Sequence, residues 1–152
     1  MPDASKKRLF WIRIGVLAII SAVAYFANVE IQSYLGEKTR GAIGLELRSL
    51  EDATAIAVAE GKPILVELSA VWCPACRKFD KAVLSDPSVQ AQINAGFVFA
   101  HLEYESDEGE AFMQLHNVKG FPTTYILNTD GTLIRQLRTT MNPVKFSEQL
   151  SL

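Results

Sequence analysis

The chain is poor in the residue types that build metal sites and disulfide frameworks. Its 152 residues include only two cysteines and two histidines, His101 and His116. A structural zinc site takes four Cys or His ligands, and neither histidine has ligand spacing relative to the cysteines. Because both cysteines belong to one short motif, the chain is not built on a disulfide framework. We expect no resident metal and no cofactor.

Excess charge of one sign and repetition are also missing. The chain has 15 Lys and Arg against 17 Asp and Glu, a formal net charge of −2, which gives no indication of nucleic-acid binding. It contains no internal repeat, no low-complexity tract and no flavin or nicotinamide motif. Since 49% of the residues are apolar, a chain of this length can form one compact domain with an appendage.

Both cysteines lie in the segment Trp72-Cys73-Pro74-Ala75-Cys76, directly after the apolar run Pro63–Leu68. The run predicts a buried strand, and Pro74 favours the first turn of a helix, where the N–H that proline lacks has no intrahelical partner. A C-x-x-C pair between a strand and a helix is typical of a thiol–disulfide redox centre. We therefore interpret the motif as the chemically active part of the chain.

The spacing of the cysteines predicts a division of roles. The thiolate is the nucleophile in disulfide exchange, so one cysteine needs a lowered pKa. Cys73 would stand at the helix start, where unpaired N–H groups and the helix dipole favour negative charge. Cys76, one turn further along, could resolve a mixed disulfide by attacking the sulfur of Cys73. We assign Cys73 as the attacking thiol and Cys76 as the resolving thiol.

Three other interpretations of the cysteine pair stay open. The two side chains could be buried structural cysteines, or they could be half of a zinc site. They could also bind Cu(I), which prefers soft thiolate ligands, although no Met or His cluster supports such a site.

The appendage is the uncharged N-terminal stretch Ile14–Val29. Counted from Leu9, its apolar length approaches the ~20 residues of a membrane span. Four basic residues precede it: Lys6, Lys7, Arg8 and Arg13. Their charge places the N-terminus in the cytoplasm and the rest of the chain outside, as in a single-pass protein of the inner membrane whose C-terminal domain lies in the periplasm. The alternative is a signal peptide cleaved at Ala22-Val23-Ala24, which leaves a soluble periplasmic protein.

These features divide the chain into three parts. Residues 1–35 are the predicted signal anchor or transmembrane segment. Residues 36–45 are the predicted linker, within a polar stretch from Glu30 to Gly44 that contains several glycines. Residues 46–152 are the predicted domain.

Within the domain, the hydrophobic pattern and the capping residues Ser49, Asp86 and Asn142 predict an α/β alternation. Strands are expected at 63–68, 97–102, 123–127 and 132–137, and helices at 49–60, 74–84, 87–96, 108–116 and 143–150. Residues 128–131, Asn-Thr-Asp-Gly, predict a hairpin between the last two strands. The final helix is expected to bury Val144, Phe146 and Leu150.

Several separate motifs give the chain a family resemblance. They are Trp-Cys-Pro-Ala-Cys-Arg at 72–77, Ile-Leu-Val-Glu-Leu-Ser-Ala at 64–70, Ser-Asp-Pro-Ser-Val-Gln at 85–90 and Gly-Phe-Pro-Thr-Thr-Tyr-Ile-Leu at 120–127. In this order they resemble thioredoxin-fold proteins, most of all the periplasmic C-terminal thioredoxin-like domains of DsbD-type thiol:disulfide interchange proteins. The similarity covers about residues 46–150. It implies a thioredoxin fold, with a central mixed sheet flanked by helices.

The resemblance also implies roles for residues outside the cysteine pair. Trp72 matches the tryptophan beside the redox pair. Pro122 matches the cis-proline that faces the disulfide and holds a substrate strand, and proline is the usual carrier of a cis peptide bond. With Phe121 these two residues would form an apolar substrate groove. An ordinary trans proline in a turn is the plain alternative for Pro122.

Glu67 falls where thioredoxins keep a buried acid beneath the resolving cysteine, and there it would accept the proton that Cys76 loses. Its plain alternative is a side chain that points out of the strand. His101 stands where thioredoxins have a lysine and could tune Glu67. The sequence also departs from thioredoxin itself, which has Gly-Pro in place of Pro-Ala between the cysteines and Asp in place of Glu67.

Taken together, the residues and the resemblance predict a membrane-tethered, periplasm-facing thiol:disulfide oxidoreductase. Because the resemblance is to a reducing relay, we expect a reductase of exported proteins, recycled by a membrane or periplasmic redox partner. A thiol oxidase or isomerase is the alternative with the same chemistry. A Cu(I)-handling or assembly module without turnover is the alternative from another class.

Overall fold

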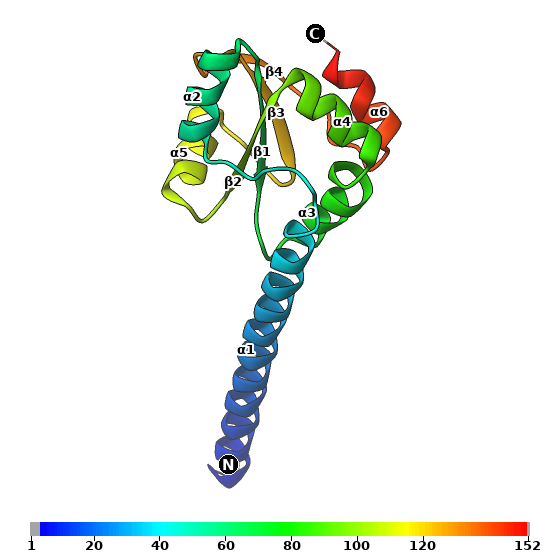
Figure 1. Ribbon diagram of the computed structural model, residues 1–152. Coiled ribbons are helices and arrows are strands. Elements are labelled where there is room, and N and C mark those ends of the chain that lie inside the picture. Colours follow the sequence, from blue (N-terminus) through cyan, green and yellow to red (C-terminus); the bar gives the residue numbers. More distant parts are fainter. Residues whose placement is uncertain (1–3, 152) are drawn as a thin grey trace.

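The computed structural model describes the backbone of residues 4–151 and the side chains of residues 7–151. Residues 1–3 of the predicted anchor, the Lys6 side chain and Leu152 at the end of the predicted domain lie outside the described part. Helix α1 (Ala4–Arg40) projects as a long rod from an α/β domain that contains every other element (Figure 1). The predicted combination of one N-terminal apolar helix and an α/β domain is confirmed.

The domain is built on one four-stranded mixed sheet with the order β2-β1-β3-β4. The strands are β1 (Ile64–Ser69), β2 (Val98–Glu103), β3 (Thr123–Leu127) and β4 (Leu133–Gln136). Strand β1 pairs in parallel with β2 and antiparallel with β3, and β3 pairs antiparallel with β4. All four predicted strands are confirmed, with ends that differ by at most one residue.

Helices cover both faces of the sheet. They are α2 (Leu50–Glu60), α3 (Pro74–Phe79), α4 (Pro87–Gly96), α5 (Asp107–Leu115) and α6 (Pro143–Ser147), with a π-helical stretch η1 (Asp80–Leu84) after α3 and a 3₁₀ turn η2 (Glu148–Leu150) after α6. Helices α2 and α5 lie on one face, and α3, α4 and α6 lie on the other (Figure 1). The predicted active-site helix is therefore one continuous stretch whose geometry changes from α to π at Asp80.

Caps set several helix ends where the sequence predicts them. The Ser49 hydroxyl accepts a hydrogen bond from the N–H of Asp52 at the start of α2, and Gly61 ends this helix in the left-handed region, with φ 67°. The Asp86 carboxylate accepts from two backbone N–H groups at the start of α4. These side chains satisfy N–H groups that a helix start leaves unpaired.

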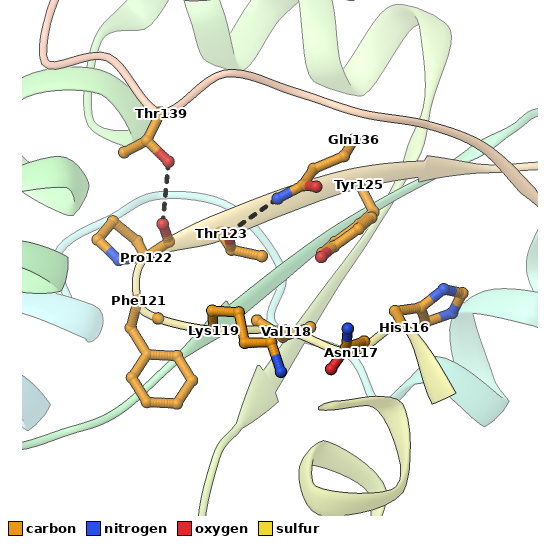
Figure 2. Close-up of a pocket in the computed structure, with 11 residues that line it drawn as sticks. His116, Asn117, Val118, Lys119, Phe121, Pro122, Thr123, Tyr125, Gln136 and Thr139 are labelled. Atoms are coloured by element: carbon orange, nitrogen blue, oxygen red, sulfur yellow. Dashed lines mark hydrogen bonds between the residues drawn. The ribbon is translucent and has the colours of Figure 1, made fainter. Parts of the chain in front are cut away.

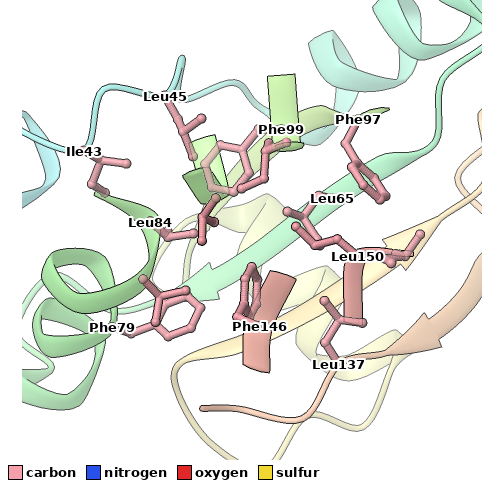
Figure 3. Packing of buried hydrophobic residues seen from close by; sticks show 14 residues of the cluster. Ile43, Leu45, Leu65, Phe79, Leu84, Phe97, Phe99, Leu137, Phe146 and Leu150 are labelled. Atoms are coloured by element: carbon pink, nitrogen blue, oxygen red, sulfur yellow. The ribbon is translucent and has the colours of Figure 1, made fainter. Parts of the chain in front are cut away.

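Strand β1 is buried along its whole length because both faces of the sheet are covered. Side chains alternate between the two faces of a strand. Ile64, Val66 and Leu68 pack toward α2 and α5. Leu65 packs on the opposite side among side chains of α3, α4 and α6 (Figure 3). The alternation places Glu67 on this second face, the side of the helix that carries the cysteines.

Two expectations were wrong. The linker expected at 36–45 is helical as far as Arg40, because the last turns of α1 pack against the domain and tertiary packing outweighs the weak helix preference of Gly36. Val144 is 65% exposed, whereas Phe146 and Leu150 are buried. Residues four apart share a helix face, and Val144, two positions before Phe146, lies on the opposite side.

Candidate redox site

Cys73 and Cys76 form a disulfide at the end of the loop that follows β1. Their Cα atoms are 5.3 Å apart. Cys73 is the N-cap of α3, and its sulfur accepts a hydrogen bond of 3.1 Å from the N–H of Cys76. In the reduced protein the same N–H favours a thiolate on Cys73. Cys73 is 8% exposed and Cys76 is 1% exposed, so Cys73 is the less buried of the two.

The loop before Cys73 is held by hydrogen bonds to both neighbouring segments. The N–H of Cys73 donates to the carbonyl oxygen of Ala70 at 2.9 Å. The N–H of Val71 donates to the Glu103 carboxylate at the end of β2, at 2.8 Å. These bonds fix the backbone that presents the Cys73 sulfur.

Glu67 is completely buried within the sheet, as the resemblance predicts. One of its carboxylate oxygens lies 3.1 Å from Nδ1 of His101, its direct neighbour on β2. Its other oxygen, Oε1, is buried as well. A buried carboxylate can accept a proton from a neighbouring group.

A second acid, Asp80, belongs to the same buried cluster and was missed at the level of the sequence. It is 3% exposed and stands one turn after Cys76, whose carbonyl oxygen accepts from the Asp80 N–H. Burial, then the adjacent Glu67 carboxylate, raises the pKa of Asp80 to about 8, against the opposing charge of Arg40. Asp80 therefore carries a proton at neutral pH, next to Glu67.

Three aromatic side chains surround the disulfide. Trp72, Tyr104 and Phe121 pack against the cluster formed by Ala70 and the two cysteines. The ring centroid of Tyr104 lies 6.5 Å from that of Trp72 and 5.0 Å from that of Phe121. Tyr104, which follows β2, was not among the predicted site residues. It packs between Trp72 and Phe121, the two aromatic residues that were predicted.

The peptide bond between Phe121 and Pro122 is cis. The Pro122 carbonyl oxygen accepts a hydrogen bond of 3.1 Å from the Thr139 hydroxyl. Both residues also line a hollow of about 420 Å³ that extends away along β3. In Figure 2, Phe121 and Pro122 stand at one end of this hollow and His116 stands at the other. The apolar surface beside the disulfide thus continues into an open depression.

The domain is similar to known proteins. Residues 46–129, more than half of the chain, match a family model described as thioredoxin-like. The chain belongs to the thioredoxin-like family. The predicted family and fold are therefore confirmed.

Curated relatives of this thioredoxin-like protein include thiol:disulfide interchange proteins named DsbD. The protein from Yersinia pestis is 28% identical over 149 residues, which are 92% of this chain and 25% of the relative. The protein from Yersinia enterocolitica is 36% identical over 99 residues, 63% of this chain and 17% of the relative. The chain thus spans about a quarter or less of the length of these relatives.

Solved structures agree with this assignment. A thioredoxin from Thermus thermophilus is 28% identical, with a TM-score of 0.64 over 70% of this chain and 84% of that one. The oxidised C-terminal domain of DsbD from Neisseria meningitidis gives a TM-score of 0.57 over 68% and 96%, at 21% identity. The second likeness concerns the fold alone.

Within this thioredoxin-like protein, the fold brings together the site residues that the sequence singled out. Cys73, Cys76, Trp72 and Phe121 share one cluster, and Glu67 lies buried in the neighbouring strand. A spacing signal could have revealed Asp80, because it follows Cys76 by four residues and so lies on the same helix face. No local signal marks Tyr104, which reaches the cluster only because β2 pairs with β1.

Proposed function

We propose that this protein is a membrane-anchored thiol:disulfide oxidoreductase that faces the periplasm and reduces disulfides of exported proteins. The observation that carries the proposal is Cys73 at a helix N-cap, with the more deeply buried Cys76 and a buried acid next to it. Support also comes from the curated relatives, whose names describe thiol:disulfide interchange. In this proposal, Cys73, Cys76 and Glu67 are the catalytic residues.

The proposed reaction consists of two thiol–disulfide exchange steps. In the reduced protein, the Cys73 thiolate attacks one sulfur of the substrate disulfide, forms a mixed disulfide and releases the other substrate sulfur, which takes up a proton. Cys76 then loses its proton and attacks the Cys73 sulfur, which releases the second substrate thiol. The substrate gains two electrons and two protons, one proton released by Cys76 and one taken from solvent, and the protein ends with the Cys73–Cys76 disulfide described above.

The second step needs a proton acceptor, since Cys76 is 1% exposed and its thiol is shielded from water. Glu67 fits this role because it is completely buried, on the sheet face that is covered by the helix with the cysteines. His101 holds one of its oxygens at 3.1 Å and so orients the carboxylate. Asp80, already protonated at neutral pH, does not compete for the proton.

Charge supports the reducing direction. Strong dithiol oxidants owe their potential to a stabilised thiolate in the reduced state. The buried Glu67 carboxylate lies on the sheet face that is covered by the helix with the cysteines, where a negative charge opposes ionisation of the thiols. Destabilising the thiolate lowers the tendency of the disulfide to accept electrons, which favours a reductant.

The substrate-binding surface in this proposal consists of Trp72, Phe121 and Pro122. Trp72 and Phe121 pack against the cysteine cluster, and Pro122 follows Phe121 through a cis peptide bond. An extended substrate segment that presents its disulfide to Cys73 would lie on these apolar side chains and could continue into the hollow toward His116.

The membrane anchor in this proposal is α1. In the described residues it is the one helix long and apolar enough to cross a membrane, and none of its most apolar part is buried. This finding rests on length and composition alone. The basic residues at its N-terminal end support a cytoplasmic N-terminus and a periplasmic domain. Its recycling partner would be a membrane or periplasmic redox protein.

The direction of electron flow is tested by a redox titration of the full chain in detergent. The protein is equilibrated with glutathione buffers, and free thiols are counted by alkylation. We expect a midpoint near that of thioredoxin, about −270 mV. A midpoint near about −120 mV would indicate an oxidant, and a pair that forms no disulfide would overturn the proposal in favour of a Cu(I)-handling module.

A Glu67→Gln variant is expected to resolve mixed disulfides about tenfold to a hundredfold more slowly at neutral pH, because it cannot take up the proton of Cys76. The first exchange step should be unchanged. Stopped-flow kinetics of both steps from about pH 6 to 9 would measure this, with Glu110→Gln, an exposed acid on α5, as the matched control. Equal resolution rates in Glu67→Gln and the parent at all pH values would refute the relay role.

A further inference from the structure

The last turns of α1 are part of the redox domain and not a free extension of the anchor. Along this helix Gly36 and Thr39 are buried, and Val29, Gln32, Ser33 and Arg40 are partly buried. This spacing of three to four residues is one face of a helix. Residues 7–28 are exposed. One face of the helix end is thus covered by the domain, and the apolar stretch before it is bare.

The backbone of α1 touches the loop that carries the redox pair. Gly36 is buried, and a Cβ atom at this position would overlap the carbonyl oxygen of Val71. Val71 precedes Cys73 by two residues. Only a residue without a side chain allows this approach, so Gly36 is required by the contact between helix and loop.

Polar contacts fasten the same helix end on both sides of the redox pair. On the α3 side, the Arg77 guanidinium donates to the Gln32 side chain at 2.6 Å and to the Gln32 carbonyl oxygen at 3.4 Å. On the β2 side, Arg40 forms an ion pair of 2.7 Å with Glu103. The same Glu103 carboxylate accepts from the N–H of Val71. The helix is therefore joined to the loop directly and through both neighbouring elements.

From these contacts we propose that α1 is a rigid arm that holds the dithiol at the membrane surface. The arm favours exchange with cysteines that other membrane-anchored proteins hold at the same distance from the membrane. At about 1.5 Å per residue, Gly36 lies roughly 10 Å beyond Val29, where the uncharged stretch ends. The end of the domain that carries α3 is the end that meets α1 (Figure 1).

The inference rests on the proposed membrane anchor. It adds that the distance of a partner's disulfide from the membrane decides how often the dithiol reaches it. A flexible tether would let the dithiol sample a wide volume, so that soluble and membrane-bound disulfides would compete by their concentration alone. A rigid arm keeps the Cys73 sulfur in a thin layer next to the lipid headgroups. A disulfide displayed far from the bilayer is then reached less often than one in that layer.

The distance of the cysteine pair from the membrane surface can be measured without an activity assay. Because the chain has two tryptophans, the Trp11→Phe change leaves Trp72, next to Cys73, as the only tryptophan donor. The full chain is placed in phosphatidylcholine vesicles that contain lipids with dansyl-labelled headgroups. We expect strong energy transfer from Trp72. A helical insert of seven residues after Val29, which raises the domain by about 10 Å and nearly preserves its facing, should reduce the transfer severalfold.

A matched pair of glycine variants tests the contact itself. Gly36→Ala is expected to separate the arm from the Val71 loop and to reduce the transfer. Gly15→Ala lies in the same helix with no atom within 4 Å of the added Cβ and should leave the transfer unchanged. If Gly36→Ala prevents folding, Gln32→Ala, which removes a side-chain acceptor of Arg77, serves instead. Transfer that is weak in the parent, or equal in the parent and the seven-residue insert, would overturn the proposal.

The selection of partners has its own measurement. The reduced full chain is offered one disulfide-containing peptide in two forms, free in solution or attached to a lipid headgroup through a short linker, at matched surface-averaged concentration. We expect about tenfold faster exchange with the attached form. The seven-residue insert after Val29, which leaves the contacts of Gln32, Gly36 and Arg40 in place, should lose this preference with unchanged exchange with the free peptide. Equal rates with both forms would overturn the arm. Absence of exchange with the free peptide would instead refute the proposed function, which separates the two failures.

Discussion

A Cys76→Ser variant is expected to stop turnover and to accumulate a mixed disulfide between Cys73 and its partner. Cys73 is the less buried of the two cysteines and keeps its thiolate character at the helix N-cap. Serine cannot attack the mixed disulfide, so the partner stays covalently bound. Steady-state reduction of a model protein disulfide should fall by roughly a hundredfold or more. Electrophoresis without reductant would show the adduct.

The control is Cys73→Ser, which removes the attacking thiol and should form almost no adduct. Cys76 is 1% exposed, so a partner disulfide has little access to its sulfur. If Cys73→Ser accumulated the adduct and Cys76→Ser did not, the roles assigned to the two cysteines would be reversed.

An Asp80→Asn variant is expected to stabilise the protein at neutral and alkaline pH. The pKa of Asp80 rises from its ordinary value of 3.8 to about 8 on folding, chiefly through burial and then through the charge of Glu67. Between these two values folding takes up a proton, so the free energy of unfolding falls as pH rises. Below 3.8 both states hold the proton, and above about 8 neither does. Asparagine removes this dependence.

The expected gain is on the order of 3 kcal/mol near pH 7 and shrinks toward zero near pH 4. Urea unfolding of the full chain in detergent micelles at about pH 4, 6 and 8 would measure it. Glu148→Gln, an exposed acid near the C-terminus, is the matched control and should change stability little at any pH. A gain that is the same at both ends of this range would show that Asp80 does not bind the additional proton. A residue whose replacement stabilises the protein is typically retained for function and not for stability.

Much of the fold could be predicted because its signals are local. The apolar run before Cys73, the proline in the following helix turn and the caps at Ser49 and Asp86 each lie within one element, and each formed as expected. The exposed side chain of Val144 shows where local pattern fails. Val144 and Phe146 are both apolar, and only the direction from which the sheet approaches decides which of them is covered.

The linker prediction failed for a related reason. Glycines and polar residues between 30 and 44 are typical of a connector when they are considered alone. In the folded protein the same features serve packing, because Gly36 permits close contact with Val71 and Arg40 pairs with Glu103. A segment that would be a weak helix in isolation is stabilised by the surface that it covers.

The sequence by itself determined the cysteine pair of the proposed redox site, the order of strands and helices, the buried acid at Glu67 and a membrane-length apolar stretch. Spacing, periodicity and motif resemblance carry this information, and all of them act over a few residues or one element. The tertiary structure alone decided that Asp80 meets Glu67, that Tyr104 joins Trp72 and Phe121, and that α1 lies on the cysteine loop. These contacts join residues far apart in the chain, and they form only when packing brings separate elements together and excludes water between them.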